Sequence, residues 1–360
     1  MKKSNITVVF GTRPEAIKLC PLILELKSRS ELNVRVVTSG QHKELCREVL
    51  EFFGIIPDLD LNIMAHGQSL FDITEKIIHE MKNELVKNPP ELLLVHGDTT
   101  TAFASSLSGF YLGVPIGHVE AGLRSNNAFS PYPEEFNRRA IDAMSFLHFC
   151  PTEHAKSNLI FEGYEQSRLF VTGNTVVDAL KYTLSGPLPE RSDNDVLLLM
   201  TVHRRENRGE RMRNIFRAVR QASEYFKELR VIFPAHPAKE VKDAIDSELS
   251  GSRIELITPL PLPEFHRLLA SCDLILTDSG GIQEEAVSLG KPLLLARDTT
   301  ERPEGIDCGV IIPVGTDPER IFNAISDALL RSKQDGSHTN PYGLGDASRR
   351  IADIILSLRT

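Results

Sequence analysis

The chain has 360 residues and a formal net charge of −8 at pH 7, which is long enough for two domains of ordinary size, each with its own core. The acidic balance leaves no basic footprint of the kind that indicates binding to nucleic acid or to an anionic membrane surface. The five cysteines are scattered and form no C-x-x-C pair, so reduced thiols are expected rather than a disulfide framework or a metal cluster.

The first element expected is a strand over residues 7–10, which breaks at Gly11. This apolar run is too short for a signal sequence, and no later segment is long enough to span a bilayer, so a cytoplasmic protein is expected. Short apolar runs then alternate with longer helical patterns from end to end. The alternation predicts an α/β fold with two Rossmann-like, doubly wound domains.

The first half, residues 1–173, is expected to form the N-terminal domain. Its predicted strands are residues 7–10, 34–37, 92–96, 116–119, 146–150 and 169–171. Its predicted helices are residues 15–29, 43–53, 70–86, 100–112, 133–143 and 153–163. The first of these helices is expected to be interrupted by Pro21, because proline removes a helical hydrogen bond.

The second half is expected to form a further domain over residues 174–345, with the boundary at Gly173-Asn174. Its predicted strands are residues 196–200, 230–234, 254–257, 274–277, 293–296 and 309–312. Residues 185–195 are rich in proline and charge, which predicts a surface loop near the hinge between the halves. The amphipathic tail, residues 346–360, predicts a C-terminal helix that packs back on the first domain.

A glycine turn in the second half carries the strongest sign of a binding site. Ser279, Gly280 and Gly281 lie between an apolar strand and a helical pattern. Glycines allow a ligand to approach the backbone, and the free N–H groups at a helix start favour an anion, so phosphate is the expected guest. Glu285 follows about one turn later, where a carboxylate can reach sugar hydroxyls. The charged loop at residues 297–302 favours a nucleotide site over an ordinary tight turn.

The glycine turn after the first strand leads into a helix that carries Arg13 and, about one turn later, Lys18. Cations near a helix start oppose the helix dipole, which favours negative charge there. An anionic ligand is therefore expected at this end of the sheet, and a solvated surface pair is the alternative.

Three carboxylates follow strands or open helices in the first half: Asp98, Glu120 and Glu134. Asp98 precedes a helix and has the simpler explanation of an N-cap. Glu134 and Glu135 follow a proline and fit a plain helix start. Glu120, directly after an apolar strand, has less of a structural explanation. Together the three indicate acid–base chemistry or recognition of sugar hydroxyls.

In the second half, the first strand runs into a charged segment that begins with His203 and Arg204. A charged run is usually a solvated surface, but this one starts at the end of a buried strand and includes a histidine, which favours a site. The next strand ends near His236, which repeats the pattern more weakly.

Seven motifs in order resemble those of the non-hydrolysing UDP-N-acetylglucosamine 2-epimerases. They are GTRPEAIK, HGDTTT, HVEAGLR, PYPEEFNRR, HRREN, LTDSGGIQEEA and RDTTERPE. The resemblance covers both halves and implies two Rossmann-like domains facing a cleft, as in GT-B glycosyltransferases. It also implies a homodimer that interconverts UDP-N-acetylglucosamine and UDP-N-acetylmannosamine without a cofactor or a metal. In the family's scheme, UDP is eliminated to a bound glycal and then added back.

The resemblance also implies roles for individual residues. Substrate binding is implied for Arg13, Lys18, Arg138, Ser279, Gly280, Gly281 and Glu285, with the serine and glycines on the diphosphate and Glu285 on the ribose. Catalysis is implied for Asp98, Glu120, Glu134 and His203. A regulatory nucleotide-sugar pocket of some bacterial members would involve Gln41, Glu135, Arg204 and His236. The chain departs from that pocket's pattern, because Glu44 replaces a glutamine and an arginine near Gly67 is missing.

Four other functions compete with this one. A hydrolysing epimerase would release free N-acetylmannosamine, and the intact motif at residues 13–18 counts against it. A GT-B glycosyltransferase would need an acceptor, and a UDP-sugar sensor would bind without turnover. A relative acting on a modified UDP-sugar, such as a diacetamido uronic acid, is the fourth.

Overall fold

The computed structural model of the chain describes residues 3–41, 43–65, 67–189, 195–330 and 339–358. It divides into two compact units: unit 1 is Met1–Ala179 with Tyr342–Thr360, and unit 2 is Leu180–Pro341. Of the loop expected at residues 185–195, residues 190–194 lie outside the described part of the chain.

The division between the units falls inside helix α7 (Thr175–Thr183) rather than before it. The boundary expected at Gly173-Asn174 is too early because the first turns of α7 belong to unit 1, where Val176 and Ala179 are buried. The return to unit 1 also comes earlier than residue 346. Tyr342 is fully buried, and its carbonyl accepts a hydrogen bond of 2.9 Å from the Asn174 N–H.

Unit 1 is built on a parallel sheet whose described strands follow the order β3-β2-β1-β4-β5-β6-β7. The strands are β1 (Ser4–Phe10), β2 (Leu32–Thr38), β3 (Leu59–Asp60), β4 (Leu92–His96), β5 (Ile116–Val119), β6 (Leu147–Cys150) and β7 (Leu169–Val171). Only β3 is unexpected from the sequence. It is two residues long and lies at the sheet edge, so it leaves no apolar run.

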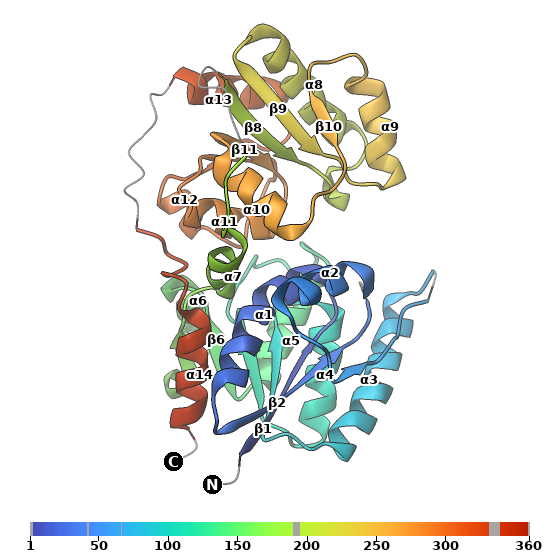
Figure 1. Ribbon diagram of the computed structural model, residues 1–360, viewed down its shortest axis with the longest axis vertical. Coiled ribbons are helices and arrows are strands. Elements are labelled where there is room, and N and C mark those ends of the chain that lie inside the picture. Colours follow the sequence, from blue (N-terminus) through green and yellow to red (C-terminus); the bar gives the residue numbers. More distant parts are fainter. Residues whose placement is uncertain (1–2, 42, 66, 190–194, 331–338, 359–360) are drawn as a thin grey trace. The chain divides into compact units, whose positions relative to one another are not determined.

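The helices of unit 1 match the predicted pattern closely. They are α1 (Arg13–Ser28), α2 (Lys43–Phe53), α3 (Leu70–Lys87), α4 (Thr100–Tyr111), α5 (Glu134–Met144), α6 (Glu153–Phe161), the start of α7, and α14 (Ala347–Ser357), with a short 3₁₀ turn η1 (Gln166–Arg168) before β7. Figure 1 shows α14, in red, as the last helix of the chain, and it packs against α1.

The interruption expected at Pro21 is wrong, because α1 runs through it. A proline inside a helix costs about 3 kcal/mol or more. Burial of the surrounding apolar face offsets that cost, since Leu19, Leu22, Ile23 and Leu26 are all fully buried, and each fully buried aliphatic side chain contributes about 1.5–3 kcal/mol.

Unit 2 has a second parallel sheet, with its described strands in the order β10-β9-β8-β11-β12-β13. The strands are β8 (Val196–Thr201), β9 (Leu229–Pro234), β10 (Glu255–Ile257), β11 (Leu274–Thr277), β12 (Leu293–Leu295) and β13 (Ile311–Pro313). The helices are α8 (Glu210–Tyr225), α9 (Lys239–Glu248), α10 (Leu262–Ser271), α11 (Gly280–Ser288), α12 (Glu304–Asp307) and α13 (Pro318–Leu330), with a 3₁₀ turn η2 (Arg205–Asn207) after β8.

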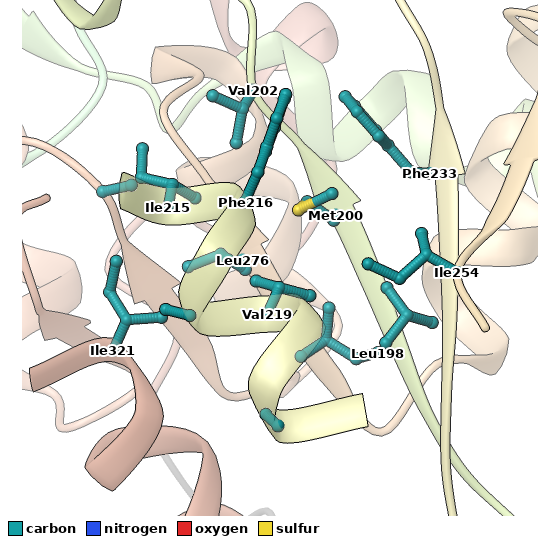
Figure 2. Packing of buried hydrophobic residues seen from close by; sticks show 14 of the residues in the cluster. Leu198, Met200, Val202, Ile215, Phe216, Val219, Phe233, Ile254, Leu276 and Ile321 are labelled. Carbon is teal, nitrogen blue, oxygen red and sulfur yellow. The ribbon is translucent and has the colours of Figure 1, made fainter. Parts of the chain in front are cut away.

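The core of unit 2 lies between its sheet and α8. Phe216 of α8 and Phe233 of β9 meet edge to face, with ring centroids 5.4 Å apart, a favoured geometry for aromatic pairs. Figure 2 shows them beside Met200 of β8, Leu276 of β11 and Ile321 of α13, all buried in the same cluster. This packing makes the sheet a rigid platform for the turns at its edge.

Both sheets follow the same winding. The chain moves outward from β1 to β3 and then returns to β4 on the other side of β1, and it repeats this path from β8 to β10 and back to β11. The predicted pair of Rossmann-like α/β domains is thereby confirmed. In such sheets, ligands bind outside the carboxyl ends of the two strands where the order reverses, so the turns after β1 and β4, and after β8 and β11, are the places to look for a site.

Among the helices that the structure describes, none combines the length and the apolar character needed to cross a membrane.

Candidate active site

The turns after β1 and β4 are tied together by Glu15, near the start of α1. One oxygen of its carboxylate accepts hydrogen bonds from the Gly11 N–H (3.1 Å) and from the N–H and hydroxyl of Thr12 (2.8 and 2.7 Å). The other accepts from the Thr99 hydroxyl at 2.7 Å. Burial raises the pKa of Glu15, and these hydrogen bonds oppose the rise. The sequence alone indicates no site role for Glu15, although the spacing Thr12-x-x-Glu15 is that of a capping box.

Asp98, in the turn after β4, is held by α5. Arg138 donates to its carboxylate from Nη2 at 2.6 Å and from Nε at 3.2 Å, and Asn137 donates to its backbone carbonyl at 2.9 Å. The N-cap explanation for Asp98 is wrong, because the cap of α4 is Thr99, whose side chain accepts the Ala102 N–H at 3.0 Å. The Asp98 side chain remains 26% exposed, so the carboxylate is both oriented and accessible.

Glu120, directly after β5, has a left-handed backbone with φ +69°. Residues other than glycine rarely adopt this conformation, and such strain is typical of functional sites. Its carboxylate is bound by the Lys18 ammonium and by Asn174 Nδ2 at 2.8 Å, and it lies 3.8 Å from His96 Nε2. The Lys18 and Glu120 side chains are only 6% and 8% exposed. The structure therefore rules out a solvated surface position for Lys18, while Arg13 at the same helix start is half-buried.

The start of α5 contributes two glutamates with different surroundings. Glu134 is half-buried, whereas Glu135 is fully buried. The Glu135 carboxylate accepts from Arg138 Nη1 at 2.7 Å, Arg139 Nε at 3.0 Å and the Ser125 N–H at 2.9 Å. Desolvation acts to raise the pKa of Glu135, but these donors bring it below its ordinary value. Glu135 thus fixes the arginine that in turn holds Asp98.

A buried charge cluster lies behind the turn that carries Asp98. His118 Nε2 is 2.7 Å from the Gly97 carbonyl, and its Nδ1 is 2.6 Å from Asp142 Oδ1. Arg124 Nη1 is 2.8 Å from Asp142 Oδ2. Burial alone would raise the pKa of Asp142, but His118 and Arg124 hold it at about 2. The sequence alone indicates no role for this cluster, in which His118 holds the Gly97 carbonyl from the buried side.

In unit 2, Asp278 ties the turn after β11 to the turn after β8. Its buried carboxylate accepts from the N–H of His203 (3.1 Å), the N–H of Arg204 (2.9 Å) and Asn207 Nδ2 (3.0 Å). The His203 ring stacks on His236, with centroids 5.6 Å apart. Although 42% of the His203 side chain is exposed, desolvation lowers its pKa, against the opposing effect of Asp278. This favours a neutral imidazole.

The helix that follows, α11, begins at Gly280, two residues before the expected start. The N–H groups of both glycines therefore belong to its first turn, and its cap Ser279 makes no side-chain capping bond. A Cβ at Gly280 would lie 3.1 Å from a guanidinium nitrogen of Arg204, 3.1 Å from one of Arg302 and 3.3 Å from a carboxylate oxygen of Glu301, which pairs with Arg302. The glycine therefore lets Arg204 and this ion pair approach a helix start, where the N–H groups favour an anion.

Glu285 lies on the same helix and is 7% exposed. Its Oε1 is 3.5 Å from His266 Nε2, and its Oε2 accepts no hydrogen bond from any described residue. A buried acceptor of this kind fits a ligand that brings its own hydroxyl group.

The four residues expected in a regulatory pocket are divided equally between the units. In unit 1, Gln41 Oε1 accepts from the Thr101 hydroxyl at 3.0 Å, and Glu135 is buried as described. In unit 2, Arg204 borders Gly280 and His236 stacks on His203.

Asp278→Asn is expected to lower the thermal unfolding temperature of unit 2. The asparagine replaces one acceptor oxygen by an NH₂ group that faces buried donors, and each unsatisfied buried group costs about 1–3 kcal/mol. Differential scanning calorimetry measures the change. Asp298→Asn is the matched control, because Asp298 is 66% exposed and pairs with Arg211 at the surface, where a change of less than about 0.5 kcal/mol is expected. Equal unfolding temperatures for the two variants would contradict the role of Asp278.

Comparisons with known proteins identify the family. The family model described as UDP-N-acetylglucosamine 2-epimerase matches residues 24–356. The chain is 47% identical over 365 residues to the UDP-N-acetylglucosamine 2-epimerase of Bacillus subtilis, covering 99% of this chain and 96% of that protein. It is 41% identical over 371 residues to the enzyme of Neisseria meningitidis, covering 99% of this chain and all of that protein.

Solved structures agree. The Neisseria meningitidis UDP-GlcNAc 2-epimerase bound to UDP-GlcNAc superposes with a TM-score of 0.94 at 41% identity, covering 98% of this chain and 100% of that one. A putative epimerase from Listeria monocytogenes gives a TM-score of 0.95 at 43% identity, covering 100% and 97%. A kitacinnamycin glycosyltransferase, 12% identical with a TM-score of 0.68, shares the fold alone. The chain therefore belongs to the family of non-hydrolysing UDP-N-acetylglucosamine 2-epimerases, enzymes of the isomerase class.

Proposed function

We propose that the chain interconverts UDP-N-acetylglucosamine and UDP-N-acetylmannosamine by eliminating UDP to a bound glycal and adding it back. The proposal is carried by two sets of side chains: an anion site at the strand reversal of unit 2, and three carboxylates of unit 1, of which Asp98 follows β4, Glu120 follows β5 and Glu134 opens α5. The C2 proton of an acetamido sugar is not next to a ketone, so direct deprotonation would be very slow. Elimination avoids that barrier, because C1 loses UDP as C2 loses its proton.

The unit 2 residues bind and release UDP in this scheme. The N–H groups of Gly280 and Gly281, with Ser279, hold the diphosphate at the start of α11. Glu285 accepts hydrogen bonds from ribose hydroxyls. Negative charge grows on the diphosphate as the C1–O bond breaks, and preorganised donors are most effective where charge develops. His203, with its lowered pKa, donates a hydrogen bond to the departing oxygen as a neutral imidazole.

The unit 1 residues act on the sugar. Inversion needs an acid and a base on opposite faces of the ring, which two carboxylates can provide. Lys18 forms a buried ion pair with Glu120, and Arg138 forms an ion pair with Asp98. Glu134, on α5, is the third candidate. The family resemblance implies that the positively charged Arg13 binds the diphosphate.

Positional isotope exchange combined with NMR tests this function. UDP-N-acetylglucosamine carrying ¹⁸O in the bridge between C1 and the β-phosphorus is incubated with the protein in D₂O. We expect two UDP-sugars at a steady ratio, deuterium at C2, and ¹⁸O distributed over the non-bridging positions of the β-phosphate. Epimerisation with the label still fixed in the bridge would exclude elimination of UDP.

The same spectra distinguish the competing functions. Stoichiometric free sugar and UDP would indicate a hydrolysing epimerase, and a glycoside formed with an added acceptor would indicate a glycosyltransferase. Binding without turnover would indicate a sensor. Faster turnover of a UDP-diacetamido uronic acid than of UDP-N-acetylglucosamine would indicate a different sugar substrate.

We also propose that the protein is a homodimer. Apolar side chains are exposed along two neighbouring helices of unit 1: Phe110 (55%) and Tyr111 (73%) on α4, and Phe136 (54%) on α5. Exposed apolar patches on soluble proteins often mark interaction surfaces. Light scattering after size exclusion is expected to give twice the 40.1 kDa chain mass. Phe136→Asp is expected to shift that mass towards one chain, and an unchanged dimer would place the interface elsewhere.

A further inference from the structure

Two buried polar side chains in unit 2 lie close together, and each has an atom without a hydrogen-bond partner among the described residues. His266 on α10 is 1% exposed and Glu285 on α11 is 7% exposed. His266 Nε2 lies 3.5 Å from Glu285 Oε1, which is too long for a good hydrogen bond but close enough for attraction. Neither His266 Nε2 nor Glu285 Oε2 has a hydrogen-bond partner among the described residues. Buried polar groups usually have partners, so this pair requires an explanation.

The other side of the His266 ring is fixed. Its Nδ1 is 2.7 Å from the hydroxyl of Thr183 on α7, and that hydroxyl is also 3.3 Å from the Leu180 carbonyl. A hydroxyl can donate or accept, so it accommodates either form of Nδ1. A carboxylate only accepts. His266 therefore presents an Nε2–H to Glu285, because a lone pair there would face a negative oxygen.

We propose that His266, whose ring is held by Thr183, is a positioning residue that orients Glu285. In this orientation Glu285 Oε2 accepts a hydrogen bond from the ribose of the nucleotide. The inference rests on the proposed function, which supplies UDP as the ligand. His266 attracts Oε1, and this leaves Oε2 as the free acceptor of a nearly buried carboxylate. A site built around such an acceptor discriminates against a ligand that lacks the matching hydroxyl, because the acceptor would remain unpaired.

Calorimetric titration of the full chain with UDP, 2′-deoxy-UDP and 3′-deoxy-UDP tests the inference. The unmodified protein is expected to bind UDP about 10–100-fold more tightly than at least one deoxy analogue, as fits a hydrogen bond to a charged group. His266→Phe keeps a ring of similar size without the N–H. It is expected to reduce this preference to less than about threefold.

Further variants separate orientation from packing. His266→Gln restores an N–H donor and is expected to recover most of the preference. In Glu285→Leu, which removes both acceptor oxygens, the preference is lost, and adding His266→Phe to it changes nothing more, since both residues act through one contact. Leu269→Ala is the control. Leu269 is fully buried on the same helix, so this variant lowers the unfolding temperature but keeps the preference.

The outcomes distinguish this inference from the proposed function. If His266→Phe retains the full preference while Glu285→Leu loses it, His266 only packs and the inference fails. If Glu285→Leu also retains the preference, Glu285 does not contact the ribose, and the inference fails even though turnover can persist. If the unmodified protein binds no UDP, the proposed function fails first.

Discussion

Asp98→Asn is expected to reduce kcat by about 10²–10⁴-fold, the usual contribution of a general acid or base, with little change in the unfolding temperature. Asparagine retains the shape of the side chain and an oxygen for Arg138, but it can neither take nor give the proton. The helix start is untouched, because Thr99 rather than Asp98 caps α4. Arg138 also keeps its second partner, Glu135, at 2.7 Å. Steady-state kinetics with UDP-N-acetylglucosamine and calorimetry on the same preparation measure both quantities.

Asp72→Asn is the matched control for this change. Asp72 is an exposed carboxylate in the capping box of α3, where it accepts from the N–H and hydroxyl of Ser69. Its replacement is expected to lower the unfolding temperature only slightly with kcat unchanged. Full turnover by the Asp98 variant would leave that carboxylate with no chemical role.

Lys18→Met is expected to abolish detectable turnover and to lower the free energy of unfolding by about 3–5 kcal/mol, as is usual when one member of a buried ion pair is removed. Glu120 would then lose the ammonium that pairs with its buried carboxylate, while the contact with Asn174 and the more distant His96 remain. Thermal unfolding and the epimerisation assay report the two effects.

Two further variants show whether burial causes the loss of stability. Combining Lys18→Met with Glu120→Gln removes both charges and is expected to recover much of the stability but none of the activity. Arg230→Met breaks an exposed pair, since Arg230 and Glu255 are 40% and 43% exposed, and should cost less than about 1 kcal/mol. A Lys18 variant as stable as the Arg230 variant would contradict a buried pair.

The fold was predictable because its signals are local. The central strands of both sheets, β1 and β4 and then β8 and β11, are buried apolar runs, and motifs lie at their carboxyl ends. β3 could not be predicted, since a two-residue edge strand is specified by its neighbour β2 rather than by its own sequence. The boundary inside α7 could not be predicted either, because α7 is one continuous helix whose residues belong to both units.

The connections within the site were not predictable, because they depend on partners far apart in the sequence. Aspartate and threonine are both favoured N-cap residues, so the sequence does not show whether Asp98 or Thr99 caps α4. In the structure Thr99 is the cap, and the Asp98 carboxylate binds Arg138 on α5 instead. Asp278 directly precedes the glycine turn in the sequence, which indicates no further role for it. Its main task, organising the backbone at His203, becomes visible only when β8 and β11 are neighbours.

Unit 1 is completed by the last part of the described chain. The N–H groups of Ala347 and Ser348 donate to the Asp178 carboxylate at 3.2 and 2.9 Å, and α14 covers α1. On the ribosome, all of Leu180–Pro341 is made before these residues, which takes about 10–30 s at 5–20 residues per second. During that interval the nascent unit 1 lacks its last helix, and the side of α1 that α14 covers stays open. Unit 2 begins later in the chain than unit 1, but all of its residues are synthesised before the last residues of unit 1.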